Sequence, residues 1–277
     1  MTNKVALVTG ASSGIGESTA RKLQSQGFTV YGAARRTDRL QELASDGIRA
    51  LGMDVTDQES MEKGIAKIIE ETGRIDVLVN NAGYGSYGAI EDVSIDEGRR
   101  QFEVNVFGAM ALTQLVLPHM REQKSGTIVN ITSMGGKIYT PLGGWYHGTK
   151  FALEALSDCL RLEVAPFGIG VVVIEPGGIA TEWGGIAADN LVDSSSDSVY
   201  KKQAETVAAS LRSEANANRN SPPSVISDAI GKAVTAKRPK TRYAVGFGAK
   251  PLIAARGMLT DRQFDAIITR ATGVRHD

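Results

Sequence analysis

The segment Val5-Ala6-Leu7-Val8-Thr9-Gly10-Ala11-Ser12-Ser13-Gly14-Ile15-Gly16 decides the fold. Its apolar start predicts a buried strand, and the residues that follow the last glycine predict a helix. Gly10 permits a tight turn, while Gly14 and Gly16 carry no side chains and let backbone N–H groups approach a phosphate. Strand, glycine turn and helix in this order indicate a dinucleotide-binding unit, with a plain glycine-rich turn as the alternative.

Short apolar runs alternate with amphipathic stretches along the rest of the chain. We expect strands at 5–8, 28–33, 48–53, 75–79, 127–131, 170–174 and 242–245, and helices at 14–26, 39–44, 58–71, 96–120, 146–165 and 225–236. Strands separated by helices form right-handed βαβ units. The sequence therefore predicts an α/β fold, a Rossmann-type doubly wound parallel sheet in a single domain over 1–277.

The alternation stops in the segment 184–224, which is rich in Ala, Ser, Asp and Asn and contains Asp193-Ser194-Ser195-Ser196-Asp197-Ser198. It could be a disordered linker between two domains. However, too few residues follow it to form a second domain of ordinary size. We therefore expect a flexible C-terminal substrate lid within the single domain, polar at the Ser/Asp run and compatible with a helix at 200–215.

Composition limits the possible partners. Lys plus Arg and Asp plus Glu number 31 each, so the net charge is zero and we expect no nucleic-acid partner. The single cysteine, Cys159, excludes an internal disulfide and fits a reducing compartment; among leucines, it is expected in the core. Without a signal peptide or membrane-length apolar run, we expect a cytoplasmic protein with no membrane partner. His119 and His276 have no cluster around them, so no metal site is expected.

Three polar residues predict proton transfer at the carboxyl edge of the sheet. Tyr146 and Lys150 are four residues apart and share one helix face. An ammonium lowers the pKa of a nearby phenol, so this pair can exchange a proton with a substrate oxygen. Ser133 follows the strand 127–131 and can hydrogen-bond that same oxygen. His147 adjoins Tyr146 but points about 100° away, so we assign it no catalytic role.

The glycine spacing, Asn80-Asn81-Ala82-Gly83 and Tyr146-x3-Lys150 together resemble the classical short-chain dehydrogenase/reductase family, from residue 4 to about 181. The resemblance implies that nicotinamide gives hydride to a carbonyl carbon, Tyr146 gives the proton and Ser133 holds the oxygen. It also implies that Asn105 orders a water beside Lys150. The implied catalytic residues are Ser133, Tyr146, Lys150 and Asn105.

The same resemblance assigns the cofactor contacts. It places Pro176, Gly177 and Thr181 at the nicotinamide, Asp54 and Val55 at the adenine, and residues 81–83 at the adenosine ribose. The complete set of expected cofactor-binding residues is Gly10, Ser12, Ser13, Gly14, Ile15, Gly16, Arg35, Arg36, Asp54, Val55, Asn81, Ala82, Gly83, Tyr146, Lys150, Pro176, Gly177, Ile179 and Thr181.

The end of the second strand predicts which nicotinamide cofactor binds. An NAD enzyme places a carboxylate there, on the ribose 2′-hydroxyl, whereas this chain has Ala34. The following Arg35 carries a guanidinium suited to a 2′-phosphate. We therefore expect NADP(H) in preference to NAD(H). The alternative is that Arg35 and Arg36 are solvated residues at a helix start, with acidic partners nearby.

The substrate expectation is a hydrophobic ketone or secondary alcohol. Tyr31-Gly32-Ala33-Ala34-Arg35-Arg36 and Asn81-Ala82-Gly83-Tyr84-Gly85 are similar to the 17β-hydroxysteroid and retinol dehydrogenase-like branch. The alternatives are an NAD-linked polyol or sugar dehydrogenase, and an NADP-sensing regulatory protein without turnover. Five residues could either line a substrate pocket or pack in the core: Trp145, Trp183, Tyr139, Leu142 and Tyr87.

Assembly is the last expectation. The helices at 96–120 and 146–165 are long, and the second carries apolar residues on more than one face. Relatives pair through these helices, so we expect a homodimer or homotetramer. The alternative is that both apolar faces are buried within one chain.

Overall fold

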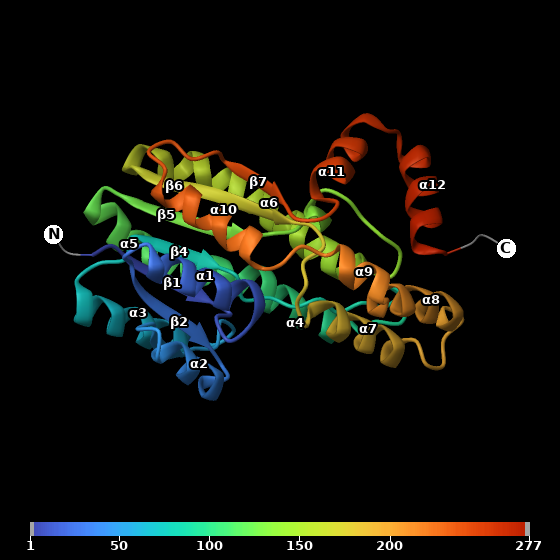
Figure 1. Cartoon of the computed structure of the whole chain (residues 1–277), viewed down its shortest axis with the longest axis horizontal. Coiled ribbons are helices and arrows are strands. Elements are labelled where there is room, and N and C mark those ends of the chain that lie inside the picture. The colour runs from blue at the N-terminus through green and yellow to red at the C-terminus, as the bar shows by residue number, and fades with distance from the viewer. Residues whose placement is uncertain (1–2, 275–277) are drawn as a thin grey trace.

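One seven-stranded sheet organises the computed structural model, which describes residues 3–274 and, for 215–217, the backbone alone. The strand order is β3-β2-β1-β4-β5-β6-β7, and every neighbouring pair is parallel (Figure 1). The strands are β1 (Val5–Thr9), β2 (Thr29–Ala34), β3 (Arg49–Gly52), β4 (Val77–Asn80), β5 (Gly126–Ile131), β6 (Ile169–Pro176) and β7 (Arg242–Val245). The chain adds β2 and β3 on one side of β1 and then adds β4 to β7 on the other side. This reversal of strand order between β1 and β4 confirms the Rossmann-type doubly wound parallel sheet.

Helices cover both faces, because strands buried on both sides need an apolar layer above and below. One layer holds α1 (Gly14–Ser25), α2 (Thr37–Ala44) and α10 (Ser224–Thr235). The other holds α3 (Gln58–Thr72), α5 (Gly108–Gln123) and α6 (Gly144–Val164) (Figure 1). The predicted strands and most predicted helices agree with these bounds to within a few residues.

The long helix predicted over 96–120 is interrupted. The structure has α4 (Ile95–Phe102), a π-helical turn (Glu103–Phe107) and then α5. A π turn accommodates an extra residue, which changes the direction of the side chains that follow and often marks a functional site. Asn105 lies inside this turn, so the irregular backbone sets where its amide points.

The C-terminal third is more helical than the sequence predicted, since within 184–224 only the stretch 200–215 was compatible with a helix. The segment after β6 forms α7 (Trp183–Ser194), α8 (Lys201–Arg212) and α9 (Glu214–Arg219), and β7 is followed by α11 (Ala249–Met258) and α12 (Asp261–Thr272). Small buried residues, including Ala187 and Ala208, allow α7 and α8 to pack closely. The polar run at 193–198 lies at the turn between these two helices. Figure 1 shows α7, α8, α11 and α12 on one side, beyond the sheet.

The expectation that Cys159 lies in the core is wrong. Cys159 is exposed on α6, whereas the next residue of that helix, Leu160, is buried. Leucines on several faces of this helix obscured which face the cysteine would join. Within residues 3–274, no helix is long and apolar enough to span a bilayer, and no group of three or more ligating side chains could hold a metal ion. His276 lies outside the described residues.

Candidate active site

The glycine loop is built to bring backbone close to a ligand. Gly10 and Gly14 have φ of 65° and 57°, the left-handed region that favours glycine. A Cβ on Gly16 would lie 2.2 Å from the Gly10 carbonyl oxygen, so no larger residue fits. No side chain caps the first turn of α1, and the Ser13 backbone is extended. The helix N-terminus therefore fits a pyrophosphate, which backbone N–H groups and the helix dipole favour.

The loop after β4 is attached to this glycine loop. The Asn81 side-chain amide donates to the Thr9 and Gly10 carbonyls at 2.9 and 3.3 Å. The backbone N–H groups of Asn81 and Ala82 donate to the Thr9 hydroxyl, both at 3.0 Å. The structure thus brings residues 81–83 beside the glycine loop, at the reversal between β1 and β4 where open α/β sheets bind ligands.

Two arginines follow the end of β2, and one of them reaches the glycine loop. Ala34 is buried at the end of the strand, whereas Arg35 and Arg36 are exposed. The Arg36 guanidinium donates to the Ser12 hydroxyl at 3.3 Å. Next to β2 in the sheet, β3 is followed by a loop that Asp54 stabilises. The Asp54 carboxylate accepts hydrogen bonds from the Thr56 N–H and hydroxyl at 3.0 and 2.8 Å.

The segment after β6 faces the glycine loop from the other side. A Cβ on Gly14 would lie 3.2 Å from the Thr181 methyl group, so the segment after β6 lies directly beside the glycine loop. Gly177 has no room for a side chain, because its Cβ would lie 2.1 Å from the Phe247 carbonyl oxygen. Ile179 forms an isolated bridge with Ser221, which fixes the segment at the start of the helical C-terminal region. The segment after β6 is therefore held beside the glycine loop by close backbone contacts.

Ser133, Tyr146 and Lys150 converge at the carboxyl end of β5. The Ser133 hydroxyl is hydrogen-bonded to the Tyr146 hydroxyl and lies 3.5 Å from the Pro176 carbonyl oxygen. The Lys150 ammonium donates to the Ile131 carbonyl at 2.9 Å and lies 5.9 Å from the centre of the Tyr146 ring. Tyr146 and Lys150 are both buried. The i, i+4 spacing therefore places phenol and ammonium in one shielded group.

Burial changes the acidity of both side chains. Burial raises the pKa of Tyr146 to about 12, although its hydrogen bond to Ser133 acts in the opposite direction. The phenol is thus neutral at physiological pH and able to donate a proton. Burial lowers the pKa of Lys150 to about 8, while the nearby Glu154 carboxylate opposes this change. Most of the Lys150 population therefore remains charged near neutral pH.

Asn105 connects the π-helical turn to the loop after β4. Its side-chain oxygen accepts from the Tyr84 N–H at 3.0 Å, and its amide donates to the Tyr84 carbonyl at 2.9 Å and the Thr149 hydroxyl at 3.1 Å. A Cβ on Gly83 would lie 3.0 Å from the Asn105 side-chain oxygen and 3.8 Å from the Lys150 nitrogen. Asn105 and Lys150 therefore both lie against Gly83.

His147 stabilises a loop and does not face the site. Its Nε2 accepts from the Thr140 backbone N–H at 3.0 Å, so Nδ1 carries the proton and donates to the Gly135 carbonyl at 2.9 Å. Burial lowers its pKa, which favours the neutral ring. The side chain thus holds the loop between Gly135 and Thr140 against α6, as expected from its direction on the helix.

Aromatic rings surround Tyr146 on the side facing α7. The rings of Trp183 and Tyr87 have centroids 5.1 and 5.8 Å from that of Tyr146. Leu142 belongs to the same apolar cluster. In contrast, Trp145 packs against α4, where Gly98 leaves room for it, and Tyr139 packs against Phe264 of α12. Two of the five candidate pocket residues therefore lie beside Tyr146, and a third belongs to the same apolar cluster.

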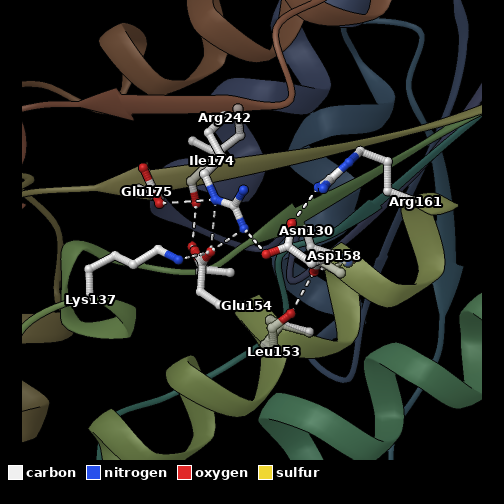
Figure 2. Close-up of polar contacts among 11 residues, drawn as sticks. Asn130, Lys137, Leu153, Glu154, Asp158, Arg161, Ile174, Glu175 and Arg242 are labelled. Carbon is white, nitrogen blue, oxygen red and sulfur yellow. Dashed lines mark hydrogen bonds and ion pairs between the residues drawn. The ribbon is translucent and has the colours of Figure 1, made fainter.

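Sequence reasoning missed a group of charged side chains around a buried glutamate behind these residues. Glu154, 3% exposed, lies one turn beyond Lys150 on α6, and Figure 2 shows it meeting Arg242 from β7 and Lys137. Continuing the i, i+4 series from Tyr146 through Lys150 would have found Glu154. No local pattern could have found Arg242, which is 88 residues away along the chain.

Comparison with known proteins agrees with this arrangement. A family model described as short chain dehydrogenase matches residues 4–190. The chain is 38% identical over 247 residues to a 3-ketodihydrosphingosine reductase from Bacteroides thetaiotaomicron, covering 89% of each chain. It is 33% identical to an NADPH-dependent 3-dehydrocapnine reductase from Ornithobacterium rhinotracheale, covering 95% of each.

A solved structure is similar over the entire length. It is a short-chain dehydrogenase from Streptomyces avermitilis, with 33% identity, a TM-score of 0.79 and complete coverage of both chains. The family match, the relatives and the fold all agree with the resemblance seen in the sequence. The chain therefore belongs to the short-chain dehydrogenase/reductase family of oxidoreductases, which bind a nicotinamide cofactor and act on alcohol and carbonyl groups.

Proposed function

We propose that this protein is an NADP(H)-dependent oxidoreductase for a hydrophobic ketone or secondary alcohol, with Tyr146 as the acid and base. The observation that carries the proposal is the buried group in which Ser133 contacts the Tyr146 hydroxyl and Lys150 lies beside the ring. A neutral phenol next to a hydroxyl and an ammonium can supply one proton and stabilise the charge that remains.

The glycine loop, the uncapped N-terminus of α1 and the segment after β6 fit a nicotinamide dinucleotide, which would supply or accept the hydride when bound. The uncapped α1 N-terminus would hold the pyrophosphate, and residues 81–83 would lie along the adenosine ribose. Asp54 and Val55 would border the adenine. The segment from Pro176 to Thr181 would hold the nicotinamide end beside Ser133.

Each polar side chain has one task in reduction. The Ser133 hydroxyl donates to the substrate carbonyl oxygen and orients it. As that oxygen gains negative charge, the Tyr146 hydroxyl transfers its proton to it. The Lys150 ammonium stabilises the resulting phenolate, and Asn105 holds a water that leads a replacement proton toward Lys150. Oxidation of an alcohol is the reverse sequence.

The 2′-phosphate would lie between the end of β2 and the glycine loop. Ala34 offers no carboxylate to repel it, and Arg35 and Arg36 are both exposed at this position. The contact between Arg36 and Ser12 supports a guanidinium over the loop that holds the phosphates. Arginine suits this role because its planar group binds phosphate oxygens in pairs.

A hydrophobic substrate is supported by the surroundings of Tyr146. Trp183, Tyr87 and Leu142 present apolar surface beside the phenol, and α7 continues that surface with buried small residues. We extend the proposal to the segment 184–224 as a lid that closes over the substrate and excludes water during hydride transfer. The two relatives named above are reductases of 3-ketodihydrosphingosine and 3-dehydrocapnine.

The test is NADPH consumption by the purified protein with a panel of carbonyl compounds. The panel contains 3-ketodihydrosphingosine, 3-dehydrocapnine and simpler hydrophobic ketones. The same ketones are assayed in parallel with NADH, and polyols are assayed with NAD⁺. Turnover of hydrophobic ketones with NADPH is the expected result. Turnover confined to polyols with NAD⁺ would identify a polyol dehydrogenase. Tight NADPH binding with no turnover of any compound would identify a cofactor-sensing protein.

A further inference from the structure

The last residue of β5, Ile131, and the two residues that follow it are each paired with one turn of α6. Residues four apart on a helix lie above one another on one face. Each of the three residues meets one turn of that face, although their order along the chain differs from the order of the turns. The three pairs are the hydroxyls of Ser133 and Tyr146, the carbonyl of Ile131 with the Lys150 ammonium at 2.9 Å, and the hydroxyl of Thr132 with the Glu154 carboxylate at 2.6 Å.

Two cations hold the Glu154 carboxylate in place. Its Oε1 accepts from Thr132, and its Oε2 accepts from Arg242 Nε and Nη2 at 3.1 and 3.0 Å. Lys137 Nζ lies 3.0 Å from the same Oε2 (Figure 2). Both carboxylate oxygens are thus used. A buried carboxylate with this many partners is rigid, because losing any one of them would leave charge unpaired.

The partners of Glu154 connect it to segments of the proposed site. Arg242 begins β7 and also donates to Asp158 at 2.6 Å, and Arg161 pairs with the other oxygen of Asp158. Arg242 Nε lies 3.5 Å from Glu175, the residue directly before Pro176 at the proposed nicotinamide end. Lys137 follows Ser133 in the same loop.

The charges of this cluster balance, and their effect extends to Lys150. The anions are Glu154, Asp158 and Glu175, and the cations are Lys137, Arg161 and Arg242. Glu154 raises the pKa of Lys150 against the effect of burial. Burial, with the repulsion from Glu154, raises the pKa of Glu175. Among these groups, Glu154 lies nearest to Lys150 along α6.

We propose that Glu154 is a positioning residue for proton transfer by Tyr146, tying α6 to Thr132 and keeping Lys150 charged beside the phenol. The inference rests on the proposed function of Tyr146 and Lys150, because Glu154 itself touches neither substrate nor cofactor. Arg242 and Lys137 serve it by fixing the carboxylate. The last strand of the sheet therefore acts on the reaction through α6.

The first variant is Glu154→Gln, which keeps the size of the side chain and an oxygen for Thr132 but removes the charge. Lys150 then loses its ammonium proton at lower pH, since the carboxylate that opposes the effect of burial on its pKa is gone. Activity that needs charged Lys150 is present below the lysine pKa and lost as pH rises through it. The alkaline fall in kcat should move down by roughly one pH unit, the low end of the effect of a close opposite charge. At the wild-type midpoint, kcat would drop about five-fold.

The second variant, Thr132→Val, removes the tie and leaves every charge. We expect a lower kcat at all pH values with the alkaline midpoint unchanged, because Lys150 keeps its anionic neighbour. NADPH affinity should remain close to wild type in both variants, since the proposed cofactor contacts are not altered. The two variants therefore separate the effect of charge from the effect of position.

Asp76→Asn is the matched control. Asp76 is 7% exposed, pairs with Arg74 at 2.6 Å and lies before β4, at the opposite end of the sheet. Its substitution removes a buried, paired carboxylate and should lower the melting temperature without moving the pH profile. If the pH profile of Glu154→Gln coincides with that of Asp76→Asn, Glu154 has only a structural role and the proposal fails. If Glu154→Gln does not fold, a wild-type kcat in Thr132→Val overturns it.

A readout independent of turnover keeps this inference separate from the proposed function. NMR titration of labelled lysine, with the Lys150 signal identified by its loss in Lys150→Met, reports the pKa of Lys150 directly. We expect a midpoint of about 8 in the wild type and a lower one in Glu154→Gln. An inactive wild type would refute the proposed function, whereas an unchanged Lys150 titration in Glu154→Gln would refute the role of Glu154.

Discussion

The proposed preference for NADP(H) can be tested directly, because it depends on the few residues at the end of β2. The perturbation is Arg36→Ala, which removes the guanidinium that reaches Ser12 at 3.3 Å, with Arg35→Ala as its matched partner on the same turn. A 2′-phosphate is present in NADPH and absent in NADH. Each substitution should therefore raise the KM for NADPH and leave the KM for NADH nearly unchanged.

The magnitude follows from the exposure of these side chains. A hydrogen bond to a charged group contributes about 1.5–3 kcal/mol. Both arginines are exposed, so solvent and salt screen the contact, and the lower figure applies. About 1.5 kcal/mol corresponds to roughly 10-fold in kcat/KM for NADPH. The effect should shrink further as ionic strength rises.

Adding Ala34→Asp should complete the change of preference. Ala34 is buried at the end of β2, where a carboxylate would accept from a 2′-hydroxyl and repel a 2′-phosphate. The assay is kcat/KM for both cofactors at two salt concentrations. Equal losses for NADPH and NADH in the arginine variants would show that the guanidinium contacts a part common to both cofactors. A wild type that already prefers NADH would refute the interpretation of this strand end.

Three further predictions concern the phenol, the lid and the assembly. Tyr146→Phe should abolish turnover while keeping NADPH affinity, because it deletes the proton donor alone; steady-state kinetics and fluorescence titration check this, and more than a few per cent residual activity would contradict it. Hydrogen exchange across 184–224 should fall when NADPH and a ketone or inhibitor bind, whereas equal, strong protection in both states would indicate a fixed wall. Phe151 and Leu162 are 43% and 72% exposed on α6, so light scattering should find a dimer or tetramer that Leu162→Glu weakens; a monomeric wild type would exclude this assembly.

Local patterns predicted much of the fold. The glycine loop and the pair of Tyr146 and Lys150 are defined by residues within one turn or one helix, and the structure places both at the carboxyl edge of the sheet. The parallel order follows from the βαβ rhythm, because each crossover helix returns the chain to the same end of the sheet. In each of these patterns, the residues that matter lie close together along the chain.

The features that escaped prediction depend on backbone irregularity or on distant partners. The π-helical turn at Glu103–Phe107 inserts a residue into an amphipathic pattern that otherwise continues on both sides. The helix α7 was hidden by its composition, because Ala187 and Ala188 are small yet fully buried. Arg242 meets Glu154 only after β7 joins the sheet.

The position of β7 at the end of the sheet has a consequence for the order in which the protein is made. A domain generally folds as a unit, and the seven strands form one sheet, so β1, α1 and β4 must wait for the last strand although they leave the ribosome first. A chain that stops before β7 also leaves Glu154 with Lys137 and without Arg242. Truncation before β7 would thus cost the site its buried ion pairs as well as the edge of the sheet.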